Sequence, residues 1–175
     1  MEIYGVSFDI VGKMPIVLLK TADGSRYLPI WIGHPEAAAI LIKLQNSSTP
    51  RPMTHDLFVE MLAQLDVRVV RITVTELREN TFYAAITIAQ DGQEIEIDSR
   101  PSDAIALAIR TEAPIFADER LIDENGIEFE AEDGEEGVPG EPVSLTQEQI
   151  EEMTSKFKSF LEDVTPEQFA EGDED

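Results

Sequence analysis

Apolar runs separated by short polar segments in the first third of the chain predict three antiparallel strands. The runs are joined at Gly12-Lys13 and at Asp23-Gly24, as strands of a meander are joined by turns. Asp23-Gly24 lies between two of these runs, and Asp-Gly favours a hairpin because its two-residue turn needs positive φ. We therefore expect a β-meander with strands over residues 3–11, 15–20 and 26–32.

Two segments with helical periodicity follow. The first spans about residues 35–45, begins at Pro35 and is apolar on most sides, which indicates a central helix. The second spans about residues 54–65, with Thr54 in the capping position and Asp56 in the first turn, where the helix dipole favours negative charge. Its apolar residues predict a one-sided helix that packs on the core: Leu57, Phe58, Met61, Leu62 and Leu65.

A second meander and a third helix complete the predicted globular region. Its first strand, over residues 67–77, shifts its alternation between Val69 and Val70, as at a bulge or in a strand buried on both faces. We therefore predict an α+β fold with two mainly antiparallel β-meanders and three packed helices. The later elements are strands over 81–89 and 93–98, a helix over 101–111 and a short strand over 114–117.

The last quarter of the chain has a different composition. Residues 131–145 are rich in glycine, proline and acidic residues, and they predict a linker after a globular domain over 1–130. Residues 146–175 predict an appended amphipathic helix with a disordered tail. The apolar stripe of that helix needs a surface, in its own domain or in a second subunit, so we expect a homodimer or another homo-oligomer. The stripe consists of Ile150, Met153, Phe157, Phe160 and Val164.

Charge disfavours a broad nucleic-acid surface. The formal net charge is −23 at pH 7; residues 1–130 carry 11 Lys and Arg against 21 Asp and Glu, and residues 131–175 carry 2 against 15. Nucleic-acid binders usually present a basic face, because phosphate neutralisation supplies most of their affinity. A nucleic-acid site in this chain would therefore have to be local, with a few arginines or a bound cation offsetting the negative field.

Composition also limits the compartment and the chemistry. The chain has no cysteine, which excludes disulfides, thiolate metal sites and cysteine nucleophiles. Its apolar runs are far shorter than the roughly 20 residues of a membrane span, and the first residues lack the pattern of a secretory signal. We expect a cytoplasmic protein with no membrane partner.

The densest group of polar residues lies where a predicted strand meets the third helix. Backbone N–H groups at a helix start bind phosphate, arginine binds it bidentately, and carboxylates hold Mg²⁺ or Mn²⁺ through hard oxygen ligands. The alternative is structural: a serine caps the helix, one aspartate stabilises its dipole, and the arginine pairs with a neighbouring acid. The group consists of Asp98, Ser99, Arg100, Ser102 and Asp103.

Two further candidates lie at the other predicted helix starts. His55, near Arg51, is a candidate general base or metal ligand because imidazole titrates near neutral pH, although a lone histidine is more often structural. Glu36 heads an apolar helix and is therefore either paired or at the mouth of a cleft. Trp31 and Phe82 are expected in the core or on sheet faces, because base-stacking aromatics usually lie beside basic side chains.

Three sequence segments together carry a family resemblance. They are Leu28-Pro-Ile-Trp-Ile-Gly33 with Glu36-Ala-Ala-Ala-Ile40, Arg51-Pro-Met-Thr-His55-Asp56-Leu57, and Asp98-Ser-Arg-Pro-Ser-Asp-Ala-Ile-Ala-Leu-Ala108. Over most of residues 2–130 the chain resembles the bacterial bifunctional nuclease domain family, and its acidic extension resembles the tail of actinobacterial members. The resemblance implies a compact α+β domain that cleaves both DNA and RNA.

The resemblance carries no residue roles with it, and we hypothesise the following roles for the polar residues from their chemistry. Glu36, Asp98 and Asp103 contribute to a divalent-cation site for Mg²⁺ or Mn²⁺, which polarises the phosphate and offsets the negative field. Arg100 steadies the scissile phosphate and His55 activates water or orients a ligand. The remaining substrate contacts are assigned to Arg51, Ser99 and Ser102.

Two other hypotheses about function remain open. The same cluster could belong to a non-enzymatic module that binds a phosphorylated small molecule or a protein partner, and the charge of the chain favours this reading. The acidic C-terminal segment could also screen a basic cleft as a mimic of nucleic acid.

Overall fold

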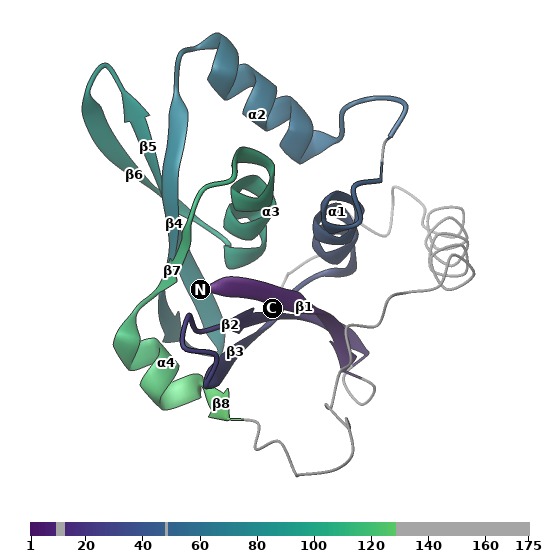
Figure 1. Ribbon diagram of the computed structural model, residues 1–175, viewed down its shortest axis with the longest axis vertical. Helices are drawn as coiled ribbons and strands as arrows, with labels where there is room; N and C mark the ends of the chain where they lie inside the picture. Colours follow the sequence, from purple (N-terminus) through teal and green to yellow (C-terminus); the bar gives the residue numbers. More distant parts are fainter. Residues whose placement is uncertain (10–12, 48, 129–175) are drawn as a thin grey trace, which may run out of the picture. The chain divides into compact units, whose positions relative to one another are not determined.

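The computed structural model describes residues 1–9, 13–47 and 49–128. The predicted linker over 131–145 and the predicted helix over 146–175 lie outside these residues. The described part confirms the α+β fold, because it contains two four-stranded sheets and the helices that pack with them (Figure 1). Within that part, no helix is long and apolar enough to span a membrane.

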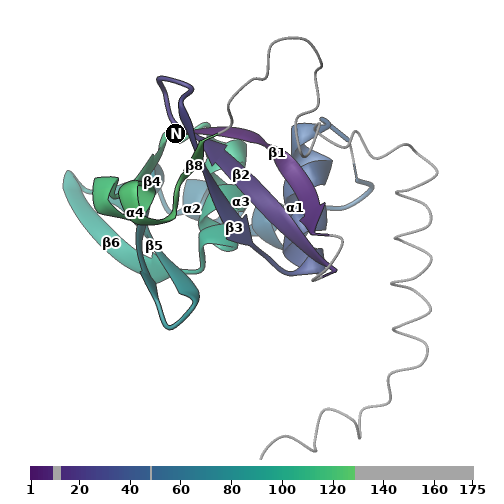
Figure 2. The ribbon, with the colours of Figure 1, turned by 90° about the horizontal axis from the view of Figure 1, so that it is seen from below.

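The first predicted meander forms one sheet with antiparallel neighbours in the order β1-β2-β3-β8. Val17 and Ile30 pair across β2 and β3 and are 0% and 1% exposed, so this face of the sheet belongs to the core. Figure 2 views the sheet with α1 and α3 behind it. Its strands are β1 (Glu2–Asp9), β2 (Met14–Lys20), β3 (Arg26–Trp31) and β8 (Ile127–Glu128).

The second predicted meander forms the other sheet, in the order β6-β5-β4-β7. β4 and β5 are antiparallel with a register shift between Val69 and Arg71, so the predicted irregularity is a bulge. Glu79 and Asn80 both have positive φ in the turn between them, as a tight two-residue hairpin requires. The strands are β4 (Arg68–Arg78), β5 (Thr81–Gln90), β6 (Gln93–Ser99) and β7 (Ile115–Ala117), which is parallel to β4.

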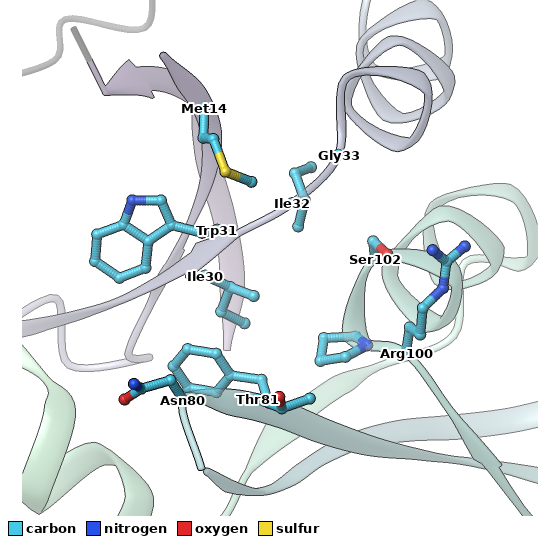
Figure 3. Close-up of a pocket in the computed structure, with 11 residues that line it drawn as sticks. Met14, Ile30, Trp31, Ile32, Gly33, Asn80, Thr81, Arg100 and Ser102 are labelled. Atoms are coloured by element: carbon cyan, nitrogen blue, oxygen red, sulfur yellow. The ribbon is translucent and has the colours of Figure 1, made fainter. Parts of the chain in front are cut away.

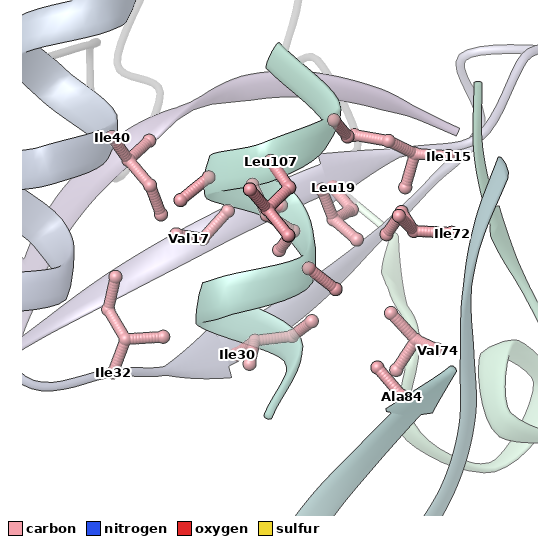
Figure 4. Close-up of a cluster of buried hydrophobic side chains, with 14 of the residues drawn as sticks. Val17, Leu19, Ile30, Ile32, Ile40, Ile72, Val74, Ala84, Leu107 and Ile115 are labelled. Atoms are coloured by element: carbon pink, nitrogen blue, oxygen red, sulfur yellow. The ribbon is translucent and has the colours of Figure 1, made fainter. Parts of the chain in front are cut away.

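Helix α3 (Pro101–Thr111) lies at the centre of the core. Residues 104–108 of this helix are all buried. Figure 4 shows α3 between strands of the two sheets, with Ile40 of the neighbouring helix α1 (His34–Leu44) directed toward it. The central helix of the fold is therefore α3, with α1 packed beside it. A further helix that the sequence pattern did not predict, α4 (Glu119–Asn125), begins where the Asp118 carboxylate accepts a hydrogen bond from the Arg120 backbone.

Helix α2 (Thr54–Gln64) differs most from its prediction. None of its residues is fully buried, and only Val59 and Leu62 pack partly against the core. Met53 rather than Thr54 precedes the first turn, and the Asp56 carboxylate accepts a hydrogen bond from its backbone N–H at 2.9 Å. The expectation that the whole apolar stripe faces the core is wrong, because these side chains are 49–62% exposed: Leu57, Phe58, Met61 and Leu65.

Candidate active site

Four of the predicted site residues form one continuous chain of polar contacts, which we call the Arg100 cluster. Arg100 Nη1 lies 2.9 Å from Glu36 Oε1, and Arg100 Nε donates to Asp103 Oδ2 at 2.8 Å. The other carboxylate oxygen, Asp103 Oδ1, lies 3.1 Å from His55 Nε2. Both oxygens of Asp103 are therefore engaged, and the cluster links three helices.

The starts of these helices position the four side chains. Glu36, His55 and Asp103 are all in the first turns of their helices, α1, α2 and α3. Arg100 immediately precedes α3, whose first residue is Pro101, a residue with φ already suited to a helix start. Because α3 packs against both α1 and α2, the three helix starts meet at one place.

Gly33, the residue before α1, gives the Glu36 carboxylate its space. Its backbone has φ −73° and ψ 158°, values open to any residue, so conformational freedom does not explain the glycine. A Cβ at this position would lie 2.2 Å from Glu36 Oε2, well inside van der Waals contact. The missing side chain therefore lets Glu36 fold back beside Arg100.

The cluster combines a solvent-exposed cation with partly buried partners. The Arg100 side chain is 66% exposed, whereas those of Glu36 and His55 are 16% and 15% exposed. Burial raises the pKa of Asp103, but hydrogen bonds from Arg100 and His55 lower it more, so the net shift is downward. The hydrogen bond to Asp103, with the nearby charge of Glu36, raises the pKa of Arg100. Arg100 and Asp103 are therefore an ion pair at neutral pH.

A second ion pair holds α2 against α3 beside the cluster. Arg110 Nε donates to Asp56 Oδ1 at 2.6 Å, and its Nη2 donates to the Ala39 carbonyl of α1 at 3.1 Å. The Arg110 side chain is only 4% exposed. The sequence reading missed Arg110, although it follows Asp103 by seven residues and so lies on the same helix face. His55 is thus fixed by its neighbour Asp56 as well as by Asp103.

A pocket of about 260 Å³ opens beside Arg100. Figure 3 shows Ile30, Trp31 and Ile32 of the β3 segment on one side and Arg100 and Ser102 on the other. The β4–β5 turn supplies Asn80, the start of β5 supplies Thr81 and Phe82, and Met14, Gly33 and Pro101 complete the lining. The sequence reading did not predict this site, because it needs the β4–β5 turn to meet the end of β3.

Trp31 is more exposed than its predicted place in the core or on a packed sheet face suggests. Its side chain is 49% exposed at the end of β3, and its Nε1 lies 3.4 Å from Asp9 Oδ2. Exposure follows from strand alternation, since the neighbouring Ile30 and Ile32 take the core side. The indole is therefore accessible at the edge of the pocket.

The structure does not bring the remaining predicted residues into the cluster. Asp98 pairs with Ala85 on β5, and by alternation its side chain lies on the sheet face opposite Ile97 and the core. Ser99 Oγ donates to the Ala84 carbonyl at 3.5 Å, and Arg51 is exposed in the loop before α2. Neither serine caps α3, since Arg100 occupies the capping position without a side-chain cap. Ser102 is buried and lines the pocket.

The arrangement of acidic and histidine side chains limits how many ligands a metal ion could find. Within residues 1–9, 13–47 and 49–128, no three His, Asp or Glu side chains are grouped so that they could hold one ion. Glu36 and Asp103 are both near Arg100, but Asp98 does not join them. A cation at the cluster would thus have at most two carboxylate ligands from this set.

Comparison with known proteins assigns this α+β domain to a family. A family model described as the bifunctional nuclease domain matches residues 17–130. The chain belongs to the bifunctional nuclease domain family, as the sequence resemblance predicted.

Some relatives match over almost their whole length and others over a shorter region. The uncharacterized protein Rv1829 of Mycobacterium tuberculosis is 35% identical over 169 residues, which cover 97% of this chain and 96% of that protein. Bifunctional nuclease 1 of Oryza sativa subsp. japonica is 32% identical over 115 residues, 63% of this chain and 35% of that protein. Bifunctional nuclease 1 of Arabidopsis thaliana is 27% identical over 117 residues, 65% of this chain and 36% of that protein. This chain therefore matches only about a third of each plant nuclease.

Proposed function

We propose that this protein is a nuclease that hydrolyses phosphodiester bonds in DNA and RNA at the Arg100 cluster. Membership of the bifunctional nuclease domain family supports the reaction class. One observation carries the choice of site: Asp103 holds the exposed Arg100 with one oxygen and His55 with the other. A phosphate-binding cation and a potential base are thus fixed by one carboxylate.

Arg100 is the group that would hold the scissile phosphate. Its Nε and Nη1 contact the two carboxylates, and a guanidinium has five N–H donors, so donors on Nη2 remain for a phosphate oxygen. A guanidinium binds phosphate through charge-assisted hydrogen bonds. Its 66% exposed side chain makes this face accessible from solvent.

His55 is the proposed general base. A neutral imidazole that donates from Nε2 to Asp103 keeps a lone pair on Nδ1, and the carboxylate stabilises the imidazolium that forms. In the proposed step a water oxygen bonds to phosphorus and the bond to the leaving sugar oxygen breaks. The water proton goes to His55 Nδ1, and the leaving oxygen takes a proton from solvent. Asp103 acts as a positioning residue for both groups.

A divalent cation, Mg²⁺ or Mn²⁺, is part of the proposal. Glu36 and Asp103 supply hard oxygen ligands, and Mg²⁺ commonly binds one or two carboxylates together with waters and substrate phosphate. When bound, such an ion would neutralise phosphate charge and polarise the phosphorus–oxygen bond. Arg100 now lies between these two carboxylates, so binding of the ion requires the exposed guanidinium to move.

A non-enzymatic binding module is the second candidate function. The net charge of −23 opposes approach of nucleic acid, and two carboxyl groups already contact Arg100. Both observations favour a small phosphorylated ligand over a polyanion. The cleavage experiment below separates the two functions.

We also propose that the protein is a homodimer or another homo-oligomer. The supporting observation is the exposed apolar face of α2, formed by Leu57, Phe58, Met61 and Leu65. Large apolar side chains gathered on one helix face mark interaction surfaces more often than scattered ones do.

Cleavage of labelled single-stranded RNA and DNA by the full chain, with and without Mg²⁺ or Mn²⁺, tests the nuclease proposal. We expect cation-dependent cleavage that falls roughly 100-fold or more in Arg100→Gln and Asp103→Asn. Arg71→Gln is the matched control, because Arg71 also contacts two carboxylates, Glu94 at 2.9 Å and Glu96 at 3.9 Å, away from the cluster.

Three results would count against the proposal in different ways. Equal cleavage by all variants would assign the activity to another site or protein. Cleavage that needs no cation would remove the metal from the mechanism. A parent protein that binds but never cleaves nucleic acid would leave the binding module as the function.

A further inference from the structure

The pocket beside the Arg100 cluster has a polar end and an apolar end. At the polar end, Arg100 and Ser102 lie at the start of α3, where backbone N–H groups favour an anion. At the other end lie Met14 and Trp31, which are 40% and 49% exposed, with Phe82 from β5. Such a division suits a ligand with one charged and one flat apolar part.

Ser102 adds a hydroxyl to the polar end. The residue is only 6% exposed overall, and it lines the pocket beside Arg100. A serine hydroxyl both donates and accepts hydrogen bonds, so it can serve a phosphate oxygen held by Arg100.

The apolar end has the chemistry of a nucleobase site. Indole, phenyl and thioether groups stack on the face of a base regardless of its identity. Asn80, at the β4–β5 turn, adds an amide that both donates and accepts hydrogen bonds, as the edge of a base requires. The volume of about 260 Å³ lies below the roughly 300–1,000 Å³ of drug-sized ligand sites, so it suits a single nucleotide.

We propose that this pocket binds one unpaired nucleotide of the substrate, with its base at Met14, Trp31 and Phe82 and its phosphate at Arg100 and Ser102. The proposal rests on the proposed nuclease function, since the phosphate at Arg100 is the one to be cleaved. A base in a duplex is stacked and paired and must be extruded before it can enter such a pocket. The pocket therefore makes the protein selective for single strands.

Intrinsic fluorescence of the full chain tests the pocket without any cleavage. Trp31 is the only tryptophan in the sequence, so its emission reports this site alone. We expect adenosine 5′-monophosphate to quench the emission in a saturable way, because its base stacks near the indole. Ribose 5-phosphate and inorganic phosphate, which have no base, should bind roughly tenfold or more weakly. Arg100→Gln should weaken the nucleotide titration, whereas the matched Arg71→Gln should leave it unchanged.

Cleavage of matched substrates separates this proposal from the proposed function. With a single strand, its duplex and an abasic single strand of the same length, we expect the first to be cleaved at least roughly tenfold faster than the other two. Trp31→Ala should reduce that preference. Equal cleavage of the three, without quenching by the nucleotide, would overturn the pocket and leave the nuclease function standing. Quenching by the nucleotide in a protein that cleaves nothing would support the pocket and overturn the nuclease function.

Discussion

At the scale of single residues, the site depends on how one guanidinium is shared. Arg100 contacts both Glu36 and Asp103 and still has an exposed face, so the two carboxylates orient it without enclosing it. Free arginine side chains lose rotamer freedom on binding phosphate, and prior fixation reduces that cost. The two carboxylates therefore offset the positive electrostatic field of Arg100, but they also fix the orientation of its guanidinium before phosphate binds.

Gly33→Ala tests whether Glu36 helps to orient the guanidinium of Arg100. The added methyl group would lie 2.2 Å from Glu36 Oε2, so the flexible carboxylate would have to move, and we expect it to move away from Arg100. We expect nucleic-acid cleavage to fall, by roughly tenfold, with a change in the free energy of unfolding within about 1 kcal/mol, since the backbone of Gly33 is open to alanine. Cleavage rate and urea unfolding of the same preparation measure both effects. Glu36→Gln is the matched variant, because it keeps the shape and removes the charge; unchanged cleavage in both would exclude Glu36 from the site.

At the scale of elements, α2 is held mainly by polar contacts. Its first turn is tied to α3 through the ion pair of Asp56 with the buried Arg110 and through His55 with Asp103. Its apolar residues add little burial, because none is fully covered. The position of the proposed base therefore depends on the Asp56–Arg110 pair.

Asp56→Asn should show this dependence in both stability and its response to pH. The hydrogen bond from Arg110 lowers the pKa of Asp56 in the folded protein, although burial opposes the shift. The unfolded state, with an aspartate pKa of about 3.9, therefore takes up the proton first as pH falls. The contribution of Asp56 to the free energy of unfolding is complete above that pH and is lost as pH falls through the folded pKa.

We therefore expect Asp56→Asn to lower the free energy of unfolding at pH 7 by about 1–3 kcal/mol and by much less in strong acid. Urea unfolding followed by circular dichroism at both pH values measures the difference. The control is Asp123→Asn, since the partner of Arg26 is 59% exposed and such surface pairs contribute at most about 1 kcal/mol. A variant as stable as the parent at pH 7 would show that the ion pair does not anchor α2.

The elements also show which features the sequence could and could not predict. Strands β2 and β3 were placed within a residue or two, because short apolar runs bounded by turn signals identify strands. Hydrophobic periodicity misled for α2, since it shows that a helix has an apolar face but not what covers that face. Glu36, His55, Arg100 and Asp103 were chosen for their chemistry at helix starts, whereas their meeting depends on tertiary packing that no local signal contains. Asp98 was wrongly included in the site, because on β6 its side chain lies on the sheet face opposite that of its neighbour Ile97.

At the scale of the whole molecule, the net charge and the apolar face of α2 have opposite effects on self-association. The negative net charge disperses copies of the protein and keeps polyanions away. The apolar face of α2 favours association, and it is a local feature that survives where salt screens charge over roughly 10 Å. Salt should therefore strengthen both self-association and the approach of nucleic acid to Arg100.

The oligomeric state of the full chain tests the role of the α2 face. Leu57 and Met61 are both 54% exposed and lie one turn apart, so a second copy that covers them would bury apolar area worth about 25 cal/mol per Å². We expect light scattering after size-exclusion chromatography to give at least twice the mass of the 19.5 kDa chain, and Leu57→Glu/Met61→Glu to give the mass of one chain. Phe116→Glu is the matched control, because Phe116 is an equally exposed apolar residue, 48%, on β7 rather than α2. A parent protein that is monomeric at every concentration would refute the proposed assembly, and an oligomer that persists in the double variant would move its interface away from α2.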